Sequence, residues 1–317
     1  MTVSEVREKL EEIYDDYRNG TLKELNAIKH VGINEEKDTV VLIVEVSEKG
    51  SKAEEELRRK LAKVVKIDLG FSGIRIQFEE SKTVAKIAGK STKFIFIAGL
   101  KGGVGKSTIT INLAYALKNL DKRVGIIDAD VYNASIAKML EMKDENLNVD
   151  EHNKIIPFHH KGIEIISTDF FSEAEEPLMW RGSMLSSMVN NYIFQVAWNK
   201  NTDYILVDLP SDTGDILMDI ATYIPDASVI IVSEDDRLSA YQTLKTYKAI
   251  KELNLNVIGI VINKYQNNNA SKYLLDKCKD IEILATIPYS KPNNNYEFEN
   301  ENIKNIFNDL ATIIDIN

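Results

Sequence analysis

Three things are scarce in this sequence: cysteine, long apolar runs and an excess of positive charge. A single cysteine, Cys278, among 317 residues excludes an intrachain disulfide and a CxxC metal site. No segment approaches the roughly 18 consecutive apolar residues of a membrane-spanning helix. The first residues, MTVSEVREKLEEIYDD, have the pattern of an acidic amphipathic helix rather than of a secretory signal. We therefore expect a cytoplasmic protein.

The net charge of −10 argues against a general nucleic-acid binder, which would need a basic face. Residues 1–90 hold 17 basic and 18 acidic side chains, so the remaining residues hold 22 and 31 and carry nearly all of the negative charge. With 44% hydrophobic residues the chain can bury a substantial core. At about 150 residues per domain, its length predicts roughly two domains.

Residues 1–80 predict a small α+β domain with the order helix, strand, strand, helix, strand (αββαβ). Apolar residues recur at helical spacing near the start of the chain. Residues 39–46 (TVVLIVEV) and 71–78 have strand patterns, and residues 51–65 between them present one apolar helical face. The polar stretch 81–92 has no sustained period and is interpreted as a linker.

The second domain, residues 93–317, alternates apolar strand patterns with helical patterns such as those over 107–120, 184–198 and 238–253. Continuous apolar runs are typical of parallel strands that are buried on both faces. The alternation predicts a three-layer α/β domain with a mainly parallel sheet. The expected strands are 94–98, 124–127, 163–166, 204–207, 228–232, 257–262 and 281–285.

The strongest motif is IAGLKGGVGKST at residues 97–108, between a strand and a helix, where a phosphate-binding loop belongs. Its glycines let backbone N–H groups wrap a β-phosphate, and Lys106 places a positive charge at the β- and γ-phosphates. The Ser107 hydroxyl can bind Mg²⁺. We therefore predict a P-loop NTPase fold that binds a nucleotide together with Mg²⁺. The expected nucleotide-binding residues are Gly102, Gly103, Val104, Gly105, Lys106, Ser107 and Thr108.

Carboxylates end two later strands of this domain, in VGIIDAD and in ILVDLPSDTGD. Parallel sheets bind ligands at the carboxyl ends of their strands. Asp208 and Asp128 are predicted to support Mg²⁺ together with Ser107, and Asp130 to orient or deprotonate the attacking water. Any one of these aspartates, taken singly, could instead be a loop residue or a helix cap.

The loop departs from the usual pattern, with Leu100 where a glycine is common and with a second lysine, Lys101, in KGGVGKS. It resembles the phosphate loop of the ParA/MinD/Mrp class of ATPases. The resemblance implies a homodimer that sandwiches two ATP molecules, in which Lys101 reaches the partner's phosphates. A second cation there would stabilise the charge of the transition state, so Lys101, Lys106 and Asp130 are the expected catalytic residues. A solvated loop lysine is the alternative for Lys101.

The segments RVGIIDADVYNASIAKML, MWRGSM and DYILVDLPSDTGD resemble Mrp/ApbC-type iron–sulfur cluster carrier ATPases, and the similarity covers roughly residues 93–265. The αββαβ pattern resembles the small iron–sulfur-assembly domain that often precedes this ATPase. The resemblance implies ATP hydrolysis in iron–sulfur cluster carriage or assembly, with client apoproteins or assembly factors as partners. It also implies that Asn263 and Pro288 contact the adenine, although Asn263 could be a plain turn residue.

The sequence departs from those carriers where they place a CxxC motif, shortly after Asn263. This chain has Tyr265, Gln266 and a run of three asparagines there. Two subunits would contribute only two thiolates, both from Cys278, whereas a [4Fe–4S] cluster usually needs four. An iron–sulfur cluster is therefore implied by the resemblance, but its usual ligands are absent.

Two other function classes remain open: a ParA/MinD-like positioning ATPase and a metal-free, nucleotide-switched adaptor that binds client proteins. The acidic second domain disfavours DNA. The apolar stripe over 303–316 contains one lysine against two aspartates, so anionic lipid would repel it. We interpret this stripe as a docked core helix and expect neither a nucleic-acid nor a membrane partner. His159 and His160 are expected to border a loop.

Overall fold

The computed structural model forms two compact units, Met1–Ile87 and Ala88–Asn317. Most of the predicted linker, 81–92, lies outside the described residues. Thr92 is included, and its hydroxyl donates to the Thr202 carbonyl at 2.7 Å. The structure describes residues 2–18, 20–25, 27–34, 37–46, 49–80, 92–131, 133–142, 148–151, 154–170, 188–189, 191–211, 217–218, 220–221, 224, 226–267, 270–277, 281–293 and 296–316.

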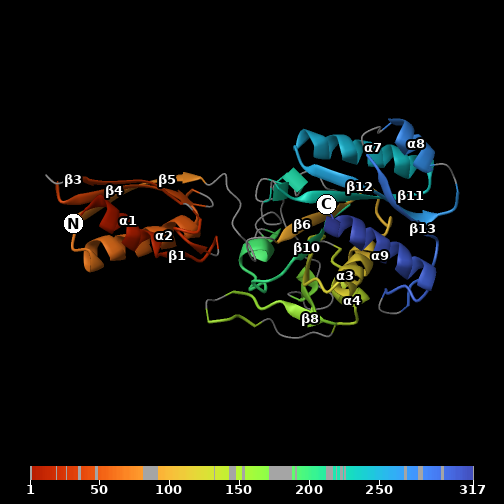
Figure 1. The fold of residues 1–317 in the computed structure, drawn as a ribbon, viewed down its shortest axis with the longest axis horizontal. Helices are drawn as coiled ribbons and strands as arrows, with labels where there is room; N and C mark the ends of the chain where they lie inside the picture. Colours follow the sequence, from red (N-terminus) through yellow and green to blue (C-terminus); the bar gives the residue numbers. More distant parts are fainter. Residues whose placement is uncertain are drawn as a thin grey trace. The chain divides into compact units, whose positions relative to one another are not determined.

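The N-terminal unit is a three-stranded sheet with two helices on one face (Figure 1). In the strand order β3-β4-β5, the central strand β4 is antiparallel to β3 and parallel to β5. Helix α2 makes the crossover that a parallel pair requires. The elements are α1 (Val3–Glu11), β1 (Tyr14–Asp15), β2 (Gly20–Thr21), β3 (Ile28–Asn34), β4 (Thr39–Val46), α2 (Lys52–Lys63), the π-helical turn η2 (Val64–Asp68) and β5 (Gly73–Glu80).

Local sequence explains this small fold. Thr2 and Glu5 form a reciprocal capping box at the start of α1, and the Ser51 side chain caps α2. Alternate residues of β4 are buried, because one face of the strand meets the helices. The predicted αββαβ order is confirmed, with the short β1–β2 pair added. The buried core of the unit includes Val6, Leu10, Val40, Leu42, Val44, Val46, Leu57 and Leu61.

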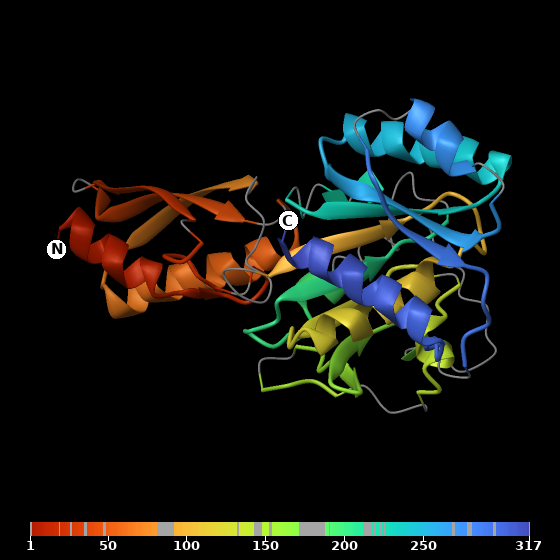
Figure 2. The same cartoon turned by 45° about the vertical axis from the view of Figure 1, so that its right-hand side comes forward.

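The C-terminal unit is built on an eight-stranded sheet with helices on both faces (Figure 2). Its strand order is β13-β12-β11-β6-β10-β7-β9-β8, parallel throughout except for the edge strand β8. The strands are β6 (Lys93–Ala98), β7 (Val124–Asp128), β8 (Phe158–His160), β9 (Ile163–Ile166), β10 (Tyr204–Asp208), β11 (Ser228–Glu234), β12 (Asn256–Tyr265) and β13 (Ile283–Pro288). The helices are α3 (Lys106–Asn119), α4 (Ile136–Met139), α7 (Arg237–Glu252), α8 (Ala270–Lys277) and α9 (Glu301–Ile316), with a 3₁₀ turn η3 (Thr168–Phe170).

All seven predicted strands are present, although the last begins at Ile283 rather than at residue 281. His159 and His160 border the turn before β9, as expected, but they lie in β8, a strand that was not predicted and that forms a hairpin with β9. Lys161 and Gly162 make its two-residue turn with φ of 47° and 78°, a conformation that fits the twist of a hairpin. The apolar run of the strand was too short to predict it.

The helix predicted over 184–198 extends too far. Residues 191–194 are helical, but residues 195–198 are not. Val196 forms a β-bridge with Ile155, and the buried Trp198 donates its indole N–H to the Tyr192 carbonyl at 3.1 Å. Tertiary contacts therefore override the apolar pattern at this end.

The C-terminal helix α9 packs against α3 and β13, as predicted for a docked core helix (Figure 2). Its buried residues recur every three or four positions, which is the spacing of one helical face. Among the described residues, no helix is both long and apolar enough to cross a bilayer. The buried residues of α9 are Ile303, Phe307, Leu310, Ala311 and Ile314.

Candidate functional site

The turn between β6 and α3 has a left-handed backbone, which favours glycine, at two positions. Gly103 and Gly105 have φ of 81° and 96°, and Gly105 is the N-cap of α3. A Cβ on Gly105 would lie 2.3 Å from Nδ2 of Asn263, and one on Gly99 would lie 2.8 Å from the Val232 carbonyl oxygen. The loop is therefore pressed against the neighbouring strands β11 and β12.

Lys106 is the first residue of α3 and is only 7% exposed. Burial lowers the pKa of its ammonium group, while the nearby carboxylates of Asp208 and Asp130 act in the opposite direction. A buried cation at the N-terminus of a helix is an arrangement suited to an anionic ligand.

Asp208 ends β10, directly beneath this helix start. The Ser107 hydroxyl donates to its Oδ2 at 2.5 Å, and the Thr110 hydroxyl lies 3.5 Å from its Oδ1. Burial raises the pKa of Asp208 to about 7, although the Ser107 hydrogen bond and the Lys106 charge oppose the rise.

Asp128 ends the adjacent strand β7 and is paired in register with Asp208. Its Oδ2 accepts hydrogen bonds from the backbone N–H groups of Ser135 and Ile136 and from the Ser167 hydroxyl, at 3.0–3.1 Å. Its Oδ1 is buried and has no hydrogen-bond partner within the described part of the chain. Burial, and then the charge of Asp208, hold the pKa of Asp128 well above its usual range. Two buried carboxyls with one unsatisfied oxygen form a place where a cation would be stabilised.

Asp130 lies two residues beyond β7, in the loop that leaves the sheet. It accepts hydrogen bonds from the backbone N–H and the side-chain amide of Asn133, at 3.3 and 3.4 Å. It is half-buried and near enough to Lys106 for its charge to act on that ammonium group.

Lys101 is not a freely solvated lysine. Its ammonium group pairs with Glu234 Oε2 and with Asp236 Oδ2, the latter at 3.0 Å, and contacts the Ser239 hydroxyl at 3.1 Å. Lys264 pairs with the other oxygen of Glu234 at 2.5 Å and donates to the Gly103 carbonyl at 2.7 Å.

Sequence reasoning missed Glu234, Asp236 and Lys264. Glu234 ends a parallel strand, β11, as Asp128 and Asp208 do. The rule that ligands bind at the carboxyl ends of such strands, applied to β11, would have selected it.

The two residues expected at the adenine occupy different surroundings. Asn263 lies in β12, is buried and donates its amide to the Val104 carbonyl at 2.8 Å. Pro288 is exposed at the end of the edge strand β13.

Thr108 lies in the first turn of α3, and its carbonyl accepts a hydrogen bond from the Asn112 amide at 2.8 Å. Cys278 and the segment 179–184 lie outside the described residues.

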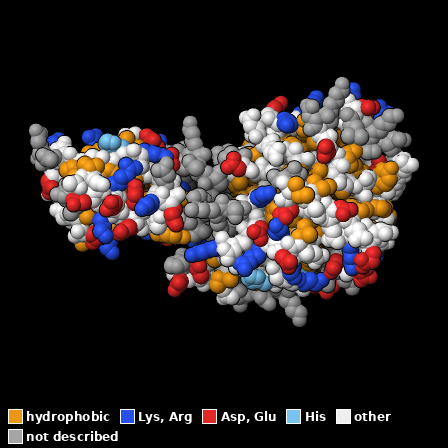
Figure 3. Space-filling view, viewed as in Figure 1, with side chains coloured by type: hydrophobic (Ala, Val, Ile, Leu, Met, Phe, Trp, Pro, Cys, Tyr) orange, Lys and Arg blue, Asp and Glu red, His pale blue; other side chains and the backbone are white. Residues whose placement is uncertain are grey.

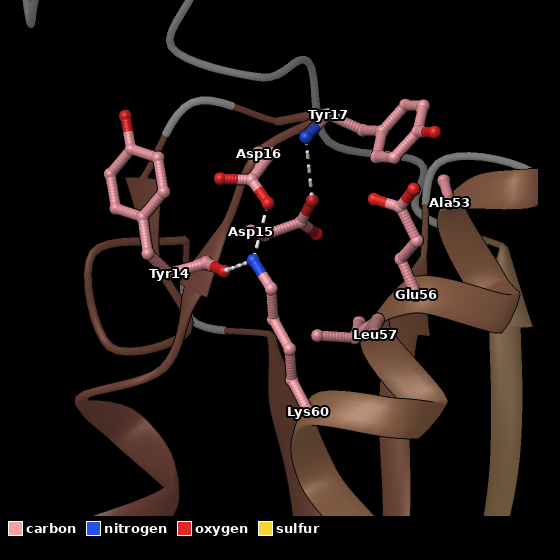
Figure 4. Close-up of a pocket in the computed structure, with 8 residues that line it drawn as sticks. All are labelled: Tyr14, Asp15, Asp16, Tyr17, Ala53, Glu56, Leu57 and Lys60. Carbon is pink, nitrogen blue, oxygen red and sulfur yellow. Dashed lines mark hydrogen bonds and ion pairs between the residues drawn. The ribbon is translucent and has the colours of Figure 1, made fainter. Parts of the chain in front are cut away.

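A pocket of the N-terminal unit, between the β1 region and α2, is a second candidate (Figure 4). Two of its three carboxylates, Asp15 and Asp16, already have basic partners within the chain. Asp15 pairs with the buried Arg18 at 2.7 Å and accepts the Tyr17 N–H, while Asp16 pairs with Lys60. Because these charges are compensated, the pocket is explained as part of the fold.

Comparisons with known proteins agree with this geometry. The family model described as "ParA: NUBPL iron-transfer P-loop NTPase" matches residues 90–286. The iron–sulfur cluster carrier protein of Bacillus subtilis is 31% identical, with 98% of this chain and 97% of that protein aligned. The protein of the same name from Rickettsia bellii is 34% identical over 74% of this chain and 75% of its own length.

Solved structures resemble the C-terminal unit. An ADP-bound nucleotide-binding protein from Archaeoglobus fulgidus is 26% identical with a TM-score of 0.53, over 71% of this chain and 88% of that one. The MinD cell division ATPase of Pyrococcus furiosus is 19% identical with a TM-score of 0.54, over 71% and 98%, and supports the fold alone. The family model spans more than half of the chain and the Bacillus relative nearly all of it, which confirms the resemblance inferred from the motifs. The chain belongs to the ParA family of P-loop NTPases, of the NUBPL iron-transfer type, and is an ATP-binding P-loop ATPase.

Proposed function

We propose that this protein is an ATP-driven switch in iron–sulfur protein maturation. One observation carries the proposal: Lys106 and Ser107 begin α3 against two buried carboxyls, Asp208 and Asp128. This arrangement suits a nucleotide phosphate bound together with a divalent cation. The relatives named as cluster carriers supply the process in which the switch acts.

Mg²⁺ is the cation that these residues fit. It prefers oxygen ligands and is usually held by one or two carboxylates together with substrate phosphates. The Ser107 hydroxyl and Asp208 would hold it, and the unsatisfied Oδ1 of Asp128 would accept from its water shell. When bound, Mg²⁺ neutralises charge on the β- and γ-phosphates.

Residues of the phosphate loop and of the neighbouring strands would bind the nucleotide and activate the attacking water. The loop glycines Gly102, Gly103 and Gly105 would let backbone N–H groups surround the phosphates, and Lys106 would bind the β- and γ-phosphate oxygens. Asp130 would orient or deprotonate the attacking water, since it lies beside the loop and remains reachable from solvent. Asn263 and Pro288 would contact the adenine, for which Asn263 is already next to the loop.

Lys101 would act across a homodimer, on the nucleotide of the partner subunit. This proposal rests on the family's dimeric sandwich and on the position of Lys101 at the outer side of the loop, where its side chain is 32% exposed. A cation supplied in trans would couple hydrolysis to assembly of the dimer.

Client apoproteins or iron–sulfur assembly factors are the proposed partners, in the cytoplasm. A nucleic acid or a membrane is not proposed. On the visible face of the space-filling view, acidic and basic side chains are interspersed, without a basic patch (Figure 3).

A metal-free adaptor is the second candidate, and one observation favours it. The chain has one cysteine, so a dimer offers two thiolates where a [4Fe–4S] cluster usually takes four. In this case ATP would control the binding and release of client proteins, and no iron–sulfur cluster would be carried.

Anaerobic reconstitution with iron and sulfide distinguishes the two candidates. A carrier should acquire charge-transfer absorbance and bound iron, and Cys278→Ala should lose both. If the wild-type chain binds ATP but gains no absorbance, the carrier role is refuted and the adaptor is supported. Cluster uptake that survives in Cys278→Ala would show that ligands other than the thiolate hold the cargo.

A further inference from the structure

One carboxylate, Glu234, joins two lysines beside the phosphate loop. Its Oε2 pairs with Lys101, which belongs to the loop, and its Oε1 pairs with Lys264 at 2.5 Å. The Lys264 ammonium group also donates to the Gly103 carbonyl at 2.7 Å. Asp236, the N-cap of α7, completes the set by pairing with Lys101 at 3.0 Å.

The backbone of β12 is bent so that Lys264 reaches this position. Lys264 has φ of 53°, which is uncommon for a residue with a Cβ. The register between β12 and β13 shifts between Ile262 and Tyr265, so Lys264 lies at an irregularity of the ladder. Such irregularities re-aim side chains next to active sites and persist where other contacts support them.

The Glu234 carboxylate is mostly buried, so its charged form is stabilised by a positively charged partner. Its side chain is only 15% exposed. Burial raises the pKa of Glu234, but the hydrogen bonds from Lys101 and Lys264 outweigh it and the net direction is downward. If Lys101 leaves to reach another subunit, Lys264 is the cation that remains on this carboxylate. A mostly buried carboxylate without a partner would be costly.

The two lysines therefore share the charge of one carboxylate, each on its own oxygen. Removing Lys264 would leave Lys101 as the main compensating charge of Glu234 and would hold Lys101 more firmly. Removing the charge of Glu234 would weaken the hold on Lys101 and leave it with Asp236 and the Ser239 hydroxyl. The two changes should shift the availability of Lys101 in opposite directions.

We propose that Glu234 retains Lys101 within its own subunit. Lys264, a positioning residue, lowers the free-energy cost of releasing Lys101 from Glu234. Glu234 and Lys264 together therefore set the nucleotide concentration at which two subunits associate. The inference rests on the proposed action of Lys101 in trans. It adds two residues, Glu234 and Lys264, that tune this action through their ion pairs.

The test measures the half-maximal concentration of AMPPNP, a non-hydrolysable ATP analogue, for dimer formation by light scattering with the full-length chain. Glu234→Gln should lower this concentration and Lys264→Met should raise it, each by about threefold, as expected for partly exposed ion pairs. Lys264→Arg should restore the wild-type value because it keeps the charge. The double variant should behave like Glu234→Gln, since Lys264 acts through Glu234.

Matched controls are Glu252→Gln and Lys248→Met, which change the same charges at exposed positions of α7 and should shift nothing. Affinity for ADP, measured by calorimetry, should change much less than dimerisation. An equal loss of ADP affinity in Lys264→Met would mean that Lys264 acts only through Gly103, and it would overturn the inference. So would shifts of the same sign in the two single variants.

These outcomes separate the inference from the proposed function. If the wild-type chain stays monomeric at saturating AMPPNP, the dimeric sandwich fails and the inference fails with it. If the wild type dimerises but Glu234→Gln and Lys264→Met leave the midpoint unchanged, only the inference is overturned.

Discussion

Single residues at the site are held in arrangements that stability alone would not favour. Two buried carboxyls, Asp128 and Asp208, face each other in register, and one oxygen of Asp128 has no hydrogen-bond partner in the described structure. Lys106 is buried with its pKa lowered by desolvation. Buried charges that are incompletely paired are costly in the absence of a ligand. A phosphate bound together with a cation would compensate Asp128, Asp208 and Lys106, so the electrostatic cost of burying them has a functional explanation.

At Lys106 we predict a loss of binding. Lys106→Ala should weaken ATP affinity at least tenfold, by about the 1.5–3 kcal/mol of a charged hydrogen bond, because no other buried cation faces the site in the described residues. Isothermal titration calorimetry measures the effect, with Lys248→Ala on the exposed side of α7 as the control. Unchanged affinity in Lys106→Ala would refute its assignment to the phosphate site.

At Asp130 we predict a loss of hydrolysis without loss of binding. Asp130→Ala should retain ATP and slow turnover by about 10²-fold or more, the size of a general-base contribution. Phosphate release under saturating ATP gives the rate, and calorimetry gives the affinity. Asp309→Ala, an exposed aspartate of α9, should leave both unchanged. Turnover close to wild type in Asp130→Ala would remove Asp130 from this role.

At the scale of elements, the parallel strands bring the candidate residues together. β7, β10 and β11 end at one edge of the sheet with Asp128, Asp208 and Glu234. The strand predictions succeeded because continuous apolar runs identify buried parallel strands. The short β8 was missed because three residues, two of them histidines, form a strand only when β9 pairs with them.

The C-terminal end of α9 provides a pH-dependent test of how this helix packs against the rest of its unit. Asp315 Oδ1 accepts from Lys122 and from the Tyr204 hydroxyl, both at 2.8 Å. The Lys122 hydrogen bond, followed by that of Tyr204, lowers the pKa of Asp315 below its ordinary value of 3.8. Its contribution to stability is therefore present above pH 3.8 and is lost as pH falls through the folded-state pKa.

We expect Asp315→Asn to lower the thermal midpoint at pH 7 by up to about 3 °C, the scale of a partly exposed pair. The difference from wild type should shrink as pH falls below about 4 and should be lost once Asp315 is protonated in the folded state as well. Thermal unfolding between pH 3 and 7 measures this, with Asp309→Asn on the same helix as control. A difference that persists or grows toward low pH would contradict the assignment.

The whole molecule consists of two units with different charge. The N-terminal 90 residues are nearly neutral, and the remainder carries the excess of acidic side chains. Each unit has its own buried core, as independent domains do. An acidic ATPase unit disfavours polyanionic partners, so its association with proteins becomes the quantity to measure.

Association of two chains is predicted to depend on nucleotide and on Lys101. Wild type with ATP and Asp130→Ala with ATP should each contain more dimer than the nucleotide-free chain, the second more persistently because hydrolysis is slow. Lys101→Ala should reduce the dimer, because the cation that reaches the partner's phosphates is lost. Light scattering gives the mass in each case. A monomer in both wild type and Asp130→Ala at saturating ATP would count against the sandwich.

Local sequence patterns were sufficient to predict the phosphate loop, the α/β alternation and the small N-terminal domain. These features depend on local patterns: glycines at Gly103 and Gly105 for left-handed backbone, apolar runs for buried strands, and capping residues for helix starts. They needed no knowledge of which strands are neighbours.

Which side chains meet at the site depends on the tertiary fold. Asp208 faces Asp128 because β10 inserts beside β7, and Glu234 reaches Lys101 because β11 lies next to β6. Lys264 reaches the loop only through an irregularity in β12. Strand order and register are set by packing between residues far apart in the chain, so no local pattern encodes these contacts.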